Sequence, residues 1–194
     1  MPSPIALIVG LGNPGSEYAQ TRHNVGFWLL DELVKNANTT FQAQSKFFGE
    51  SARIKIDNQD CRVLKPSTFM NKSGQSVGAL ASFYRIPIES VLVIHDELDL
   101  EAGAVRLKAG GGHGGHNGLR DITTCFGSDK YLRLRIGIGH PGSGSDVSKY
   151  VLNRPTTPEE MEIQNAIARS LDQMPDILSG NLQKVMNELH RKQD

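Results

Sequence analysis

The sequence predicts a single α/β domain, in which helices flank a twisted, mixed β-sheet and further helices follow at the C-terminus. Three observations support this fold class. Short apolar runs typical of buried strands alternate with segments of helical periodicity, and the final part of the chain has helical spacing alone. No repeat, low-complexity tract or linker divides residues 1–194, a length that suits one core and one rigid site.

The first elements are a buried strand and a helix. Residues 5–9 are continuously apolar and end in the turn-rich segment Gly10–Gly15, as a strand that enters a loop does. Apolar residues then recur at helical spacing over 25–34, which predicts a helix that begins just after Thr21–Asn24. His23 is therefore expected near a helix N-terminus.

Two strands and a helix are predicted next. The strands are expected near 47–56 and over 61–64, on either side of a polar turn. Asn71 then falls in a loop, ahead of an amphipathic helix around 77–84.

A central strand is predicted at 91–94, where all four residues are apolar, as in a strand covered on both faces. His95 and Asp96 are expected at its carboxyl end. Residues 105–108 and 131–138 alternate apolar and polar side chains, which predicts two half-exposed strands.

The remaining helices are predicted at 119–126, 157–178 and 182–189. Thr157 is the predicted N-cap of the long one, with Pro158 at the first helical position and Glu160 completing a capping box.

Charge is balanced over the whole chain, with 21 basic and 21 acidic residues, so no global field attracts a polyanion. A local excess occurs between Ala104 and Arg135, where six basic residues stand against two acidic ones. Arg106 and Lys108, like Arg133 and Arg135, are two residues apart on a predicted strand, so each pair projects from one sheet face. Such faces could be merely solvated, or could bind a phosphate-bearing ligand.

Cysteine usage and the N-terminus indicate the compartment. Cys61 and Cys125 are far apart and lack zinc-ligand spacing, which argues against a disulfide framework or a structural metal. The apolar run at 5–9 is too short for a signal or membrane segment. We therefore expect a cytoplasmic protein that does not enter the membrane.

Two short motifs suggest alternative functions. Gly10–Gly15 fits the GxGxxG pattern of dinucleotide-binding proteins, but no apolar stripe continues into the required helix, so we favour a plain tight loop. Gly74–Gly78 fits the GxSxG pattern of serine esterases. No strand immediately precedes it, so Ser76 is expected inside a helix.

Histidines and glycines gather in the loop 110–118. His113 and His116 could join Asp96 around a metal, but no fixed ligand spacing indicates one. The glycine amides of the loop could instead hold an oxyanion or a phosphate. Among the histidines, His23 is a plausible catalytic residue, because it lies in a polar loop next to a helix and its charge can change near neutral pH.

Six motifs, in order along the chain, resemble those of bacterial peptidyl-tRNA hydrolases. They are GLGNPG (10–15), TRHNVG (21–26), TFMNKSG (68–74), HDELD (95–99), GGGHGGHNGLRD (110–121) and RLRIGIGHPG (133–142). The resemblance implies hydrolysis of the ester between a peptide and the ribose of tRNA, which recycles the tRNA. It also implies a cytoplasmic monomer with peptidyl-tRNA as its RNA substrate, and with no cofactor, no metal and no obligatory protein partner.

The resemblance also assigns catalytic roles. His23 would be the general base that activates water, and Asp96 would orient His23 and stabilise its imidazolium form. The family's active-site amides match Asn13, Asn71 and Asn117, which would hold the peptide backbone, the water and the terminal nucleotide.

Further matches concern substrate binding. Tyr18 and Met70 match residues that line the substrate channel, and His116 matches the neighbour of the catalytic aspartate. Lys108 and Arg135 match a clamp for the 5′-phosphate of tRNA. One segment departs from the pattern: the chain has Ser-Gly-Ser at 143–145, where some relatives carry a lysine thought to assist tRNA binding, which leaves the extent of the tRNA footprint open.

Overall fold

A seven-stranded sheet with the order β2-β3-β4-β1-β5-β7-β6 runs through the centre of the computed structural model, which describes residues 4–191. The central strands β4, β1, β5 and β7 are parallel, while β2, β3 and β6 are antiparallel to their neighbours. The strands are β1 (Leu7–Gly10), β2 (Gln42–Gln44), β3 (Gly49–Ile56), β4 (Gln59–Pro66), β5 (Val91–Glu97), β6 (Val105–Ala109) and β7 (Leu132–Gly137).

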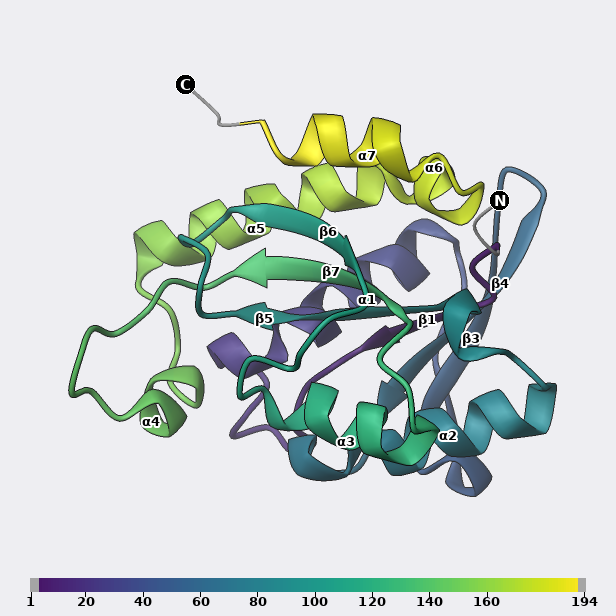
Figure 1. The fold of residues 1–194 in the computed structure, drawn as a ribbon, viewed down its shortest axis with the longest axis horizontal. Coiled ribbons are helices and arrows are strands. Elements are labelled where there is room, and N and C mark those ends of the chain that lie inside the picture. The colour runs from purple at the N-terminus through teal and green to yellow at the C-terminus, as the bar shows by residue number, and fades with distance from the viewer. Residues whose placement is uncertain (1–3, 192–194) are drawn as a thin grey trace.

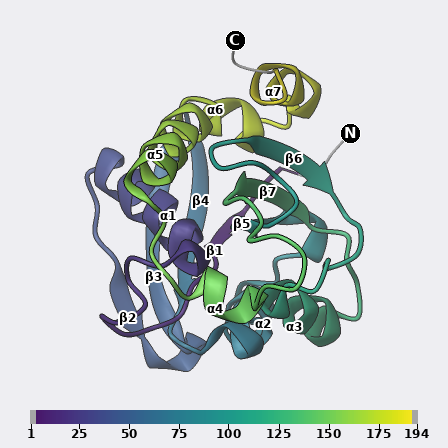
Figure 2. The same cartoon turned by 90° about the vertical axis from the view of Figure 1, so that its left-hand side faces the viewer.

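Helices cover both faces of this sheet, as Figures 1 and 2 show. The helices are α1 (Val25–Asn36), α2 (Ser73–Tyr84), α3 (Asn117–Phe126), α4 (Val147–Val151), α5 (Thr157–Asp172), α6 (Met174–Leu178) and α7 (Leu182–Leu189). One hydrophobic cluster packs α1, α5, α6 and α7 on one face, and a second packs α2 and α3 on the other. The predicted fold class is confirmed. None of the helices in residues 4–191 is long and apolar enough to cross a membrane.

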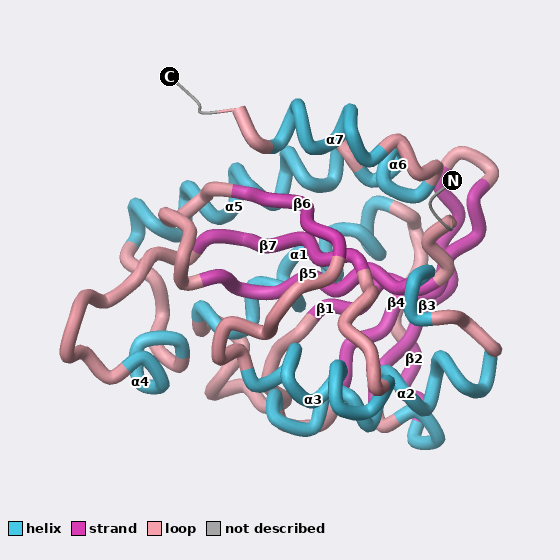
Figure 3. The backbone as a smooth tube through the Cα atoms, in the orientation of Figure 1, coloured by secondary structure: helices cyan, strands magenta, loops and turns pink. Residues whose placement is uncertain are grey.

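The parallel arrangement of β1 and β5 positions the candidate site. Their register pairs Gly10 with Ile94, so the loop after β1 and the last residues of β5 lie at the same edge of the sheet. Figure 3 shows that long loops gather at the end of the sheet where α4 lies. Residues distant in sequence therefore meet at one edge, where ligands bind in open α/β sheets.

The glycines of the first short motif have a packing role, and the serine of the second is buried. A side chain at Gly10 would meet the carbonyl group of Gly26, and one at Gly12 would meet the ring of Phe27, so these glycines let the end of β1 and the loop after it approach α1. Ser76 lies inside α2, is fully buried, and donates a hydrogen bond to the carbonyl oxygen of Phe47 at 2.6 Å. The tight-loop interpretation and the helical placement of Ser76 are both confirmed.

The predicted position of His95 and Asp96 at the carboxyl end of a central strand is confirmed. Strand β5 continues three residues beyond Ile94, through Glu97, because the parallel neighbour β7 extends the hydrogen-bond ladder. Asn71 lies in a 3₁₀ turn, Met70–Lys72, which leads directly into α2, and not in an irregular loop.

The cap and the length of the long helix also differ from prediction. Thr156, and not Thr157, is the N-cap of α5, and Glu159 completes the capping box. Both threonines are followed three residues later by a glutamate, but Glu159 also receives a hydrogen bond from Arg22, which selects the first pair. The helix then breaks at Gln173, since the following Pro175 removes a backbone donor.

Strand β7 is more buried than its alternating pattern predicted. It lies between β5 and β6, and Arg133 is only 3% exposed although it was expected on a half-exposed face with Arg135. Arg133 is buried because the glycine-rich loop, residues 110–118, folds over it. The guanidinium group of Arg133 donates hydrogen bonds to two carbonyl groups of this loop.

Candidate active site

His23 and Asp96 lie in direct contact, as the sequence suggested without being able to show it. His23 sits in a 3₁₀ turn, Arg22–Asn24, immediately before α1. Its Nδ1 atom is 2.8 Å from Oδ2 of Asp96, and both residues are buried. With Nδ1 bound to the carboxylate, the Nε2 atom of His23 is left to face a ligand.

His116 occupies the second oxygen of the same carboxylate. Its Nε2 atom is 2.8 Å from Oδ1 of Asp96, and its Nδ1 atom accepts hydrogen bonds from the backbone amides of Gly118 and Leu119. Because Nδ1 accepts, the proton of the neutral ring must be on Nε2, from where it is donated to Asp96. The ring of His116 is thus also the N-cap of α3.

His95 holds the backbone of Asp96 from the opposite sheet face. Its ring is fully buried, and Nδ1 donates to the carbonyl oxygen of Asp96 at 2.7 Å. Asp96 is therefore held through both its carboxylate and its main chain.

Burial and hydrogen bonding shift the pKa values of Asp96, His23 and His95. Burial alone would raise the pKa of Asp96, but the charges and hydrogen bonds of His23 and His116 hold it well below its ordinary value. Burial lowers the pKa of His23, and the charge and hydrogen bond of Asp96 outweigh this effect, so the pKa is raised above 6.5. For His95, burial dominates and lowers the pKa to about 3, so this ring is neutral at physiological pH.

Asn13 is anchored so that its amide nitrogen is available. Its Oδ1 atom accepts from the backbone N–H of Met70 at 2.7 Å. The side chain of Asn24 bonds both the N–H and the carbonyl group of Asn13, at 2.9 Å each. Since Oδ1 is used, Nδ2 of Asn13 can donate to a ligand. Sequence reasoning missed Asn24, although it lies within the TRHNVG motif.

The other predicted substrate residues surround this centre to different degrees. Asn117 and Asn71 are both exposed. Asn117, at the start of α3, lines a cavity that opens beside His23 and Asp96, whereas Asn71 does not line it. Tyr18 packs edge-to-face on Phe69, with ring centroids 6.3 Å apart. Phe69 is 57% exposed and was not among the residues predicted from the sequence.

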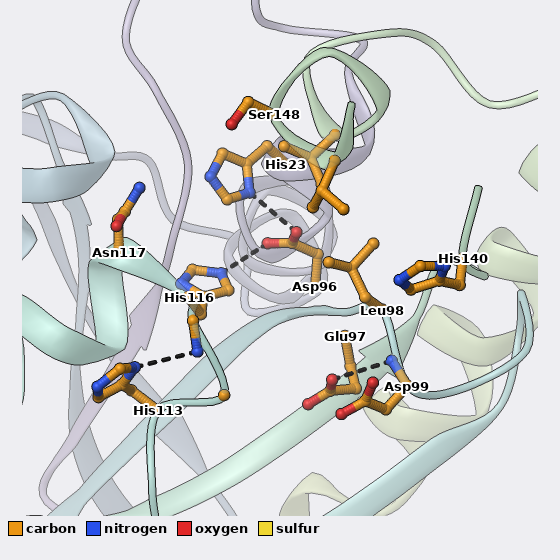
Figure 4. A pocket seen from close by; sticks show the side chains of 14 residues that line it. His23, Asp96, Glu97, Leu98, Asp99, His113, His116, Asn117, His140 and Ser148 are labelled. Carbon is orange, nitrogen blue, oxygen red and sulfur yellow. Dashed lines mark hydrogen bonds and ion pairs between the residues drawn. The ribbon is translucent and has the colours of Figure 1, made fainter. Parts of the chain in front are cut away.

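A cavity of about 300 Å³ opens beside the three hydrogen-bonded groups, shown in close-up in Figure 4. It is lined by His23, Asp96, Glu97, Leu98, Asp99, His113, Gly114, Gly115, His116, Asn117, His140, Val147, Ser148 and Val151. Ser148, on α4, lies close to the ring of His23 in this view and was also missed by sequence reasoning. A small polar substrate group can thus reach Nε2 of His23.

The same three side chains could in principle ligate a metal. One ligand atom each from His23, Asp96 and His116 lies within 4.8 Å of the others. Two hydrogen bonds of 2.8 Å already join these atoms, so a cation would have to replace both. His113 is turned away from Asp96 and its Nδ1 accepts from the amide of Gly115, contrary to the alternative that grouped it with Asp96.

The predicted phosphate clamp lies on the face of β6 and β7. The strand register pairs Arg106 with Arg135 and Lys108 with Arg133, so the two predicted pairs share one face. Lys108 is exposed, and Arg135 is partly exposed with its Nε donating to Glu97 at 2.9 Å. Three of the four cations are thus accessible to a ligand, while Arg133 is buried.

Comparison with known proteins places this chain in a family. The family model described as peptidyl-tRNA hydrolase matches residues 7–194. The peptidyl-tRNA hydrolase of Neisseria meningitidis serogroup A is 53% identical over 192 residues, covering 99% of this chain and all of the relative. That of Halorhodospira halophila is 53% identical over 184 residues, covering 95% of each chain.

Solved structures agree. A crystal structure of peptidyl-tRNA hydrolase from Acinetobacter baumannii superposes with a TM-score of 0.94 at 48% identity, covering 97% of this chain and 96% of that one. The motifs, the fold and these relatives lead to one assignment: the chain belongs to the peptidyl-tRNA hydrolase family.

Proposed function

We propose that this member of the hydrolase family cleaves the ester between a peptide and the terminal ribose of tRNA, with His23 as the general base. The observation that carries the proposal is the 2.8 Å contact between His23 Nδ1 and Asp96 in a buried setting, which leaves Nε2 facing a cavity. That arrangement suits proton abstraction from water, because a histidine oriented by a carboxylate can take and return a proton near neutral pH.

The proposed reaction uses this geometry. Water loses a proton to Nε2 of His23 while its oxygen attacks the ester carbonyl carbon. The imidazolium that forms is stabilised by the charge of Asp96. Collapse of the tetrahedral intermediate breaks the bond to the ribose oxygen, which takes the proton from His23. The products are a peptide acid and tRNA with a free hydroxyl group.

Asp96 can support this cycle because it remains ionised and cannot rotate. Its two oxygens bind two histidines, and its carbonyl group binds a third. A raised pKa of His23 means that the base is fully deprotonated only above pH 6.5. We therefore expect turnover to rise with pH through the pKa of His23 and then to level off.

The asparagines are proposed as donors to the substrate. Asn13 offers Nδ2, and its fixed Oδ1 prevents the amide from flipping. Asn117, at the cavity, and Asn71, beside Met70, would hold further parts of the peptide and the terminal nucleotide. A donor aimed at the developing oxyanion is typically worth about 3 kcal/mol of transition-state stabilisation.

The remaining proposed contacts divide between the two ends of the substrate. Tyr18 and Met70 would line the peptide side, and Lys108 and Arg135 would bind the 5′-phosphate of tRNA. We further propose that the chain acts in the cytoplasm as a monomer, without a metal, a cofactor or an obligatory partner.

A serine nucleophile is the main competing mechanism, and Ser148 is its best candidate because it lines the cavity near His23. No hydrogen bond joins Ser148 to His23 among residues 4–191, so water remains the favoured nucleophile. Ser76 is buried and bonded to Phe47, which makes it unable to attack a substrate.

The test is peptide release from an N-acylated aminoacyl-tRNA in the presence of a chelator. His23→Ala should lower turnover by about 10²- to 10⁴-fold, the usual contribution of a general base. Ser148→Ala is the matched control at the same cavity and should stay within a few-fold of wild type. Retained activity in His23→Ala, or loss in Ser148→Ala, would contradict the mechanism, and inhibition by the chelator would contradict metal independence.

A further inference from the structure

Arg133 is a buried cation for which the proposed mechanism has no use. It is 3% exposed, and none of the carboxylates in residues 4–191 forms an ion pair with it. A buried charge without an ionic partner is costly, and an apolar side chain of similar volume is often equally good or better for stability. Its presence therefore calls for a role other than filling the core.

The hydrogen bonds of Arg133 are directed at the glycine-rich loop. Nη1 donates to the carbonyl oxygen of Gly112 at 2.6 Å, and Nη2 donates to that of Gly111. Tyr131 lies beneath the guanidinium group, whose central carbon is 4.7 Å from the ring centroid. A planar guanidinium with two parallel donors fixes two successive carbonyl groups at once, which an ammonium group does less well.

This loop would otherwise be mobile, because glycine has the largest conformational freedom. Gly111, Gly114 and Gly115 adopt positive φ angles of 101°, 57° and 84°. After Gly112 the chain turns tightly, with the amide of His116 bonded to the carbonyl oxygen of His113 at 2.9 Å. The position of His116 is thus linked to the carbonyl groups that Arg133 holds.

We propose that Arg133 is a positioning residue, which supports the reaction by fixing the glycine-rich loop so that His116 is held against Asp96. The inference rests on the proposed function, in which Asp96 must be oriented to assist His23. It also separates Arg133 from the phosphate clamp, although Arg133 faces the same side of the sheet as Lys108 and Arg135.

A second, independent anchor acts on the same loop and offers a matched variant. The side chain of Asp129 accepts from the amide of Gly111 at 3.1 Å. Asp129 is partly exposed, so its replacement has little risk of unfolding the protein. If the loop matters for catalysis, loss of either anchor should act on the same kinetic quantity.

The experiment compares Arg133→Met, Arg133→Lys, Asp129→Ala and Arg135→Ala in steady-state hydrolysis of N-acylated aminoacyl-tRNA at several salt concentrations. Arg133→Met should keep the wild-type melting temperature while kcat falls by about 10- to 100-fold, the scale of a small misplacement at a reacting centre. KM and its salt dependence should remain close to wild type. Arg133→Lys and Asp129→Ala should fall between Arg133→Met and wild type in kcat.

A spectroscopic measurement is independent of turnover. In the wild type, the Nε2 proton of His116 should give a downfield NMR signal from its hydrogen bond to Asp96. Arg133→Met should shift or broaden this signal, and Arg135→Ala should leave it unchanged.

The outcomes separate the possible roles. Unchanged kcat with raised KM and weaker salt dependence in Arg133→Met would make Arg133 a phosphate contact and overturn the inference. Unchanged kinetics together with an unchanged His116 signal would reduce it to a structural residue. If His23→Ala retains turnover, the proposed function itself fails, whereas an inactive His23→Ala beside normal Arg133 variants defeats only the inference.

Discussion

The proposed catalytic centre around Asp96 on β5 and the phosphate face, which carries Lys108 and Arg135 on β6 and β7, are neighbours in the sheet. Their side chains are held in place to very different degrees. At the catalytic centre, both carboxylate oxygens of Asp96 have a histidine partner at 2.8 Å, and Asp96 is 3% exposed. On the phosphate face, Lys108 is exposed, and within residues 4–191 the side chain of Arg106 bonds only the carbonyl oxygen of Val105 on its own strand. Arg135 is partly exposed, with a single carboxylate partner, Glu97.

This contrast indicates a division of labour. Groups that act on the transition state must be held before the substrate arrives, because reorganising them during the reaction costs rate. Cations that attract a flexible polyanion gain little from rigidity, since most of their effect comes from charge. Arg133 combines features of both regions, because it is as buried as Asp96 and carries a positive charge like Lys108.

The largest expected effect comes from breaking the rigid region with Asp96→Asn. Turnover should fall by about 10²- to 10⁴-fold, because the imidazolium form of His23 loses its counter-charge. Without that charge, burial dominates and the pKa of His23 should fall below 6.5. The pKa can be measured by NMR titration of His23. A pKa that stays raised in the variant would show that another group supports His23.

A smaller and different effect is expected on the phosphate face. Lys108→Ala and Arg135→Ala should each raise KM several-fold and reduce the salt slope of binding by about 1, with kcat nearly unchanged. Steady-state kinetics at several salt concentrations would measure both quantities. Arg53→Ala, an exposed cation on β3 at the far side of the sheet, is the control and should change neither. A loss of kcat equal to the rise in KM would contradict the division of labour.

A third effect concerns stability rather than turnover. The pKa of His95 is lowered to about 3 in the folded state, from about 6.5 in the unfolded chain, so only the unfolded state binds a proton between these values. His95 should therefore reduce the free energy of unfolding by about 1.4 kcal/mol for each pH unit below about 6.5, until about pH 3.

Urea denaturation at about pH 5.5 and about pH 4.5 would test this with His95→Asn, whose amide can replace the donor to Asp96. In this window the contribution of His23 is constant, because its raised pKa gives stability that is fully present below 6.5. The pKa of Asp96 is lowered, so its stabilisation is still largely present at these pH values. The variant should be less sensitive to acid than wild type, and an equal slope would show that His95 titrates normally.

Local sequence patterns predicted the elements well where burial dictates the pattern. The strands predicted at 5–9 and 91–94 are present as β1 (Leu7–Gly10) and β5 (Val91–Glu97), because a parallel strand covered on both faces needs apolar residues at its central positions. The helix at 25–34 was confirmed for the analogous reason that one face of α1 packs on the sheet. The resemblance of six motifs predicted the family, which the comparisons confirmed.

What the sequence by itself determined was therefore the fold class, the family and the set of residues to examine, since these depend on composition, periodicity and motif order. Only the tertiary structure brought Nδ1 of His23 within 2.8 Å of Oδ2 of Asp96, a residue 73 positions away along the chain. It alone also distinguished Arg133 from Arg135, two identical residues on the same strand face. Arg133 is buried and bonded to the glycine-rich loop, whereas Arg135 is partly exposed and pairs with Glu97, because burial depends on which distant segment packs over a side chain.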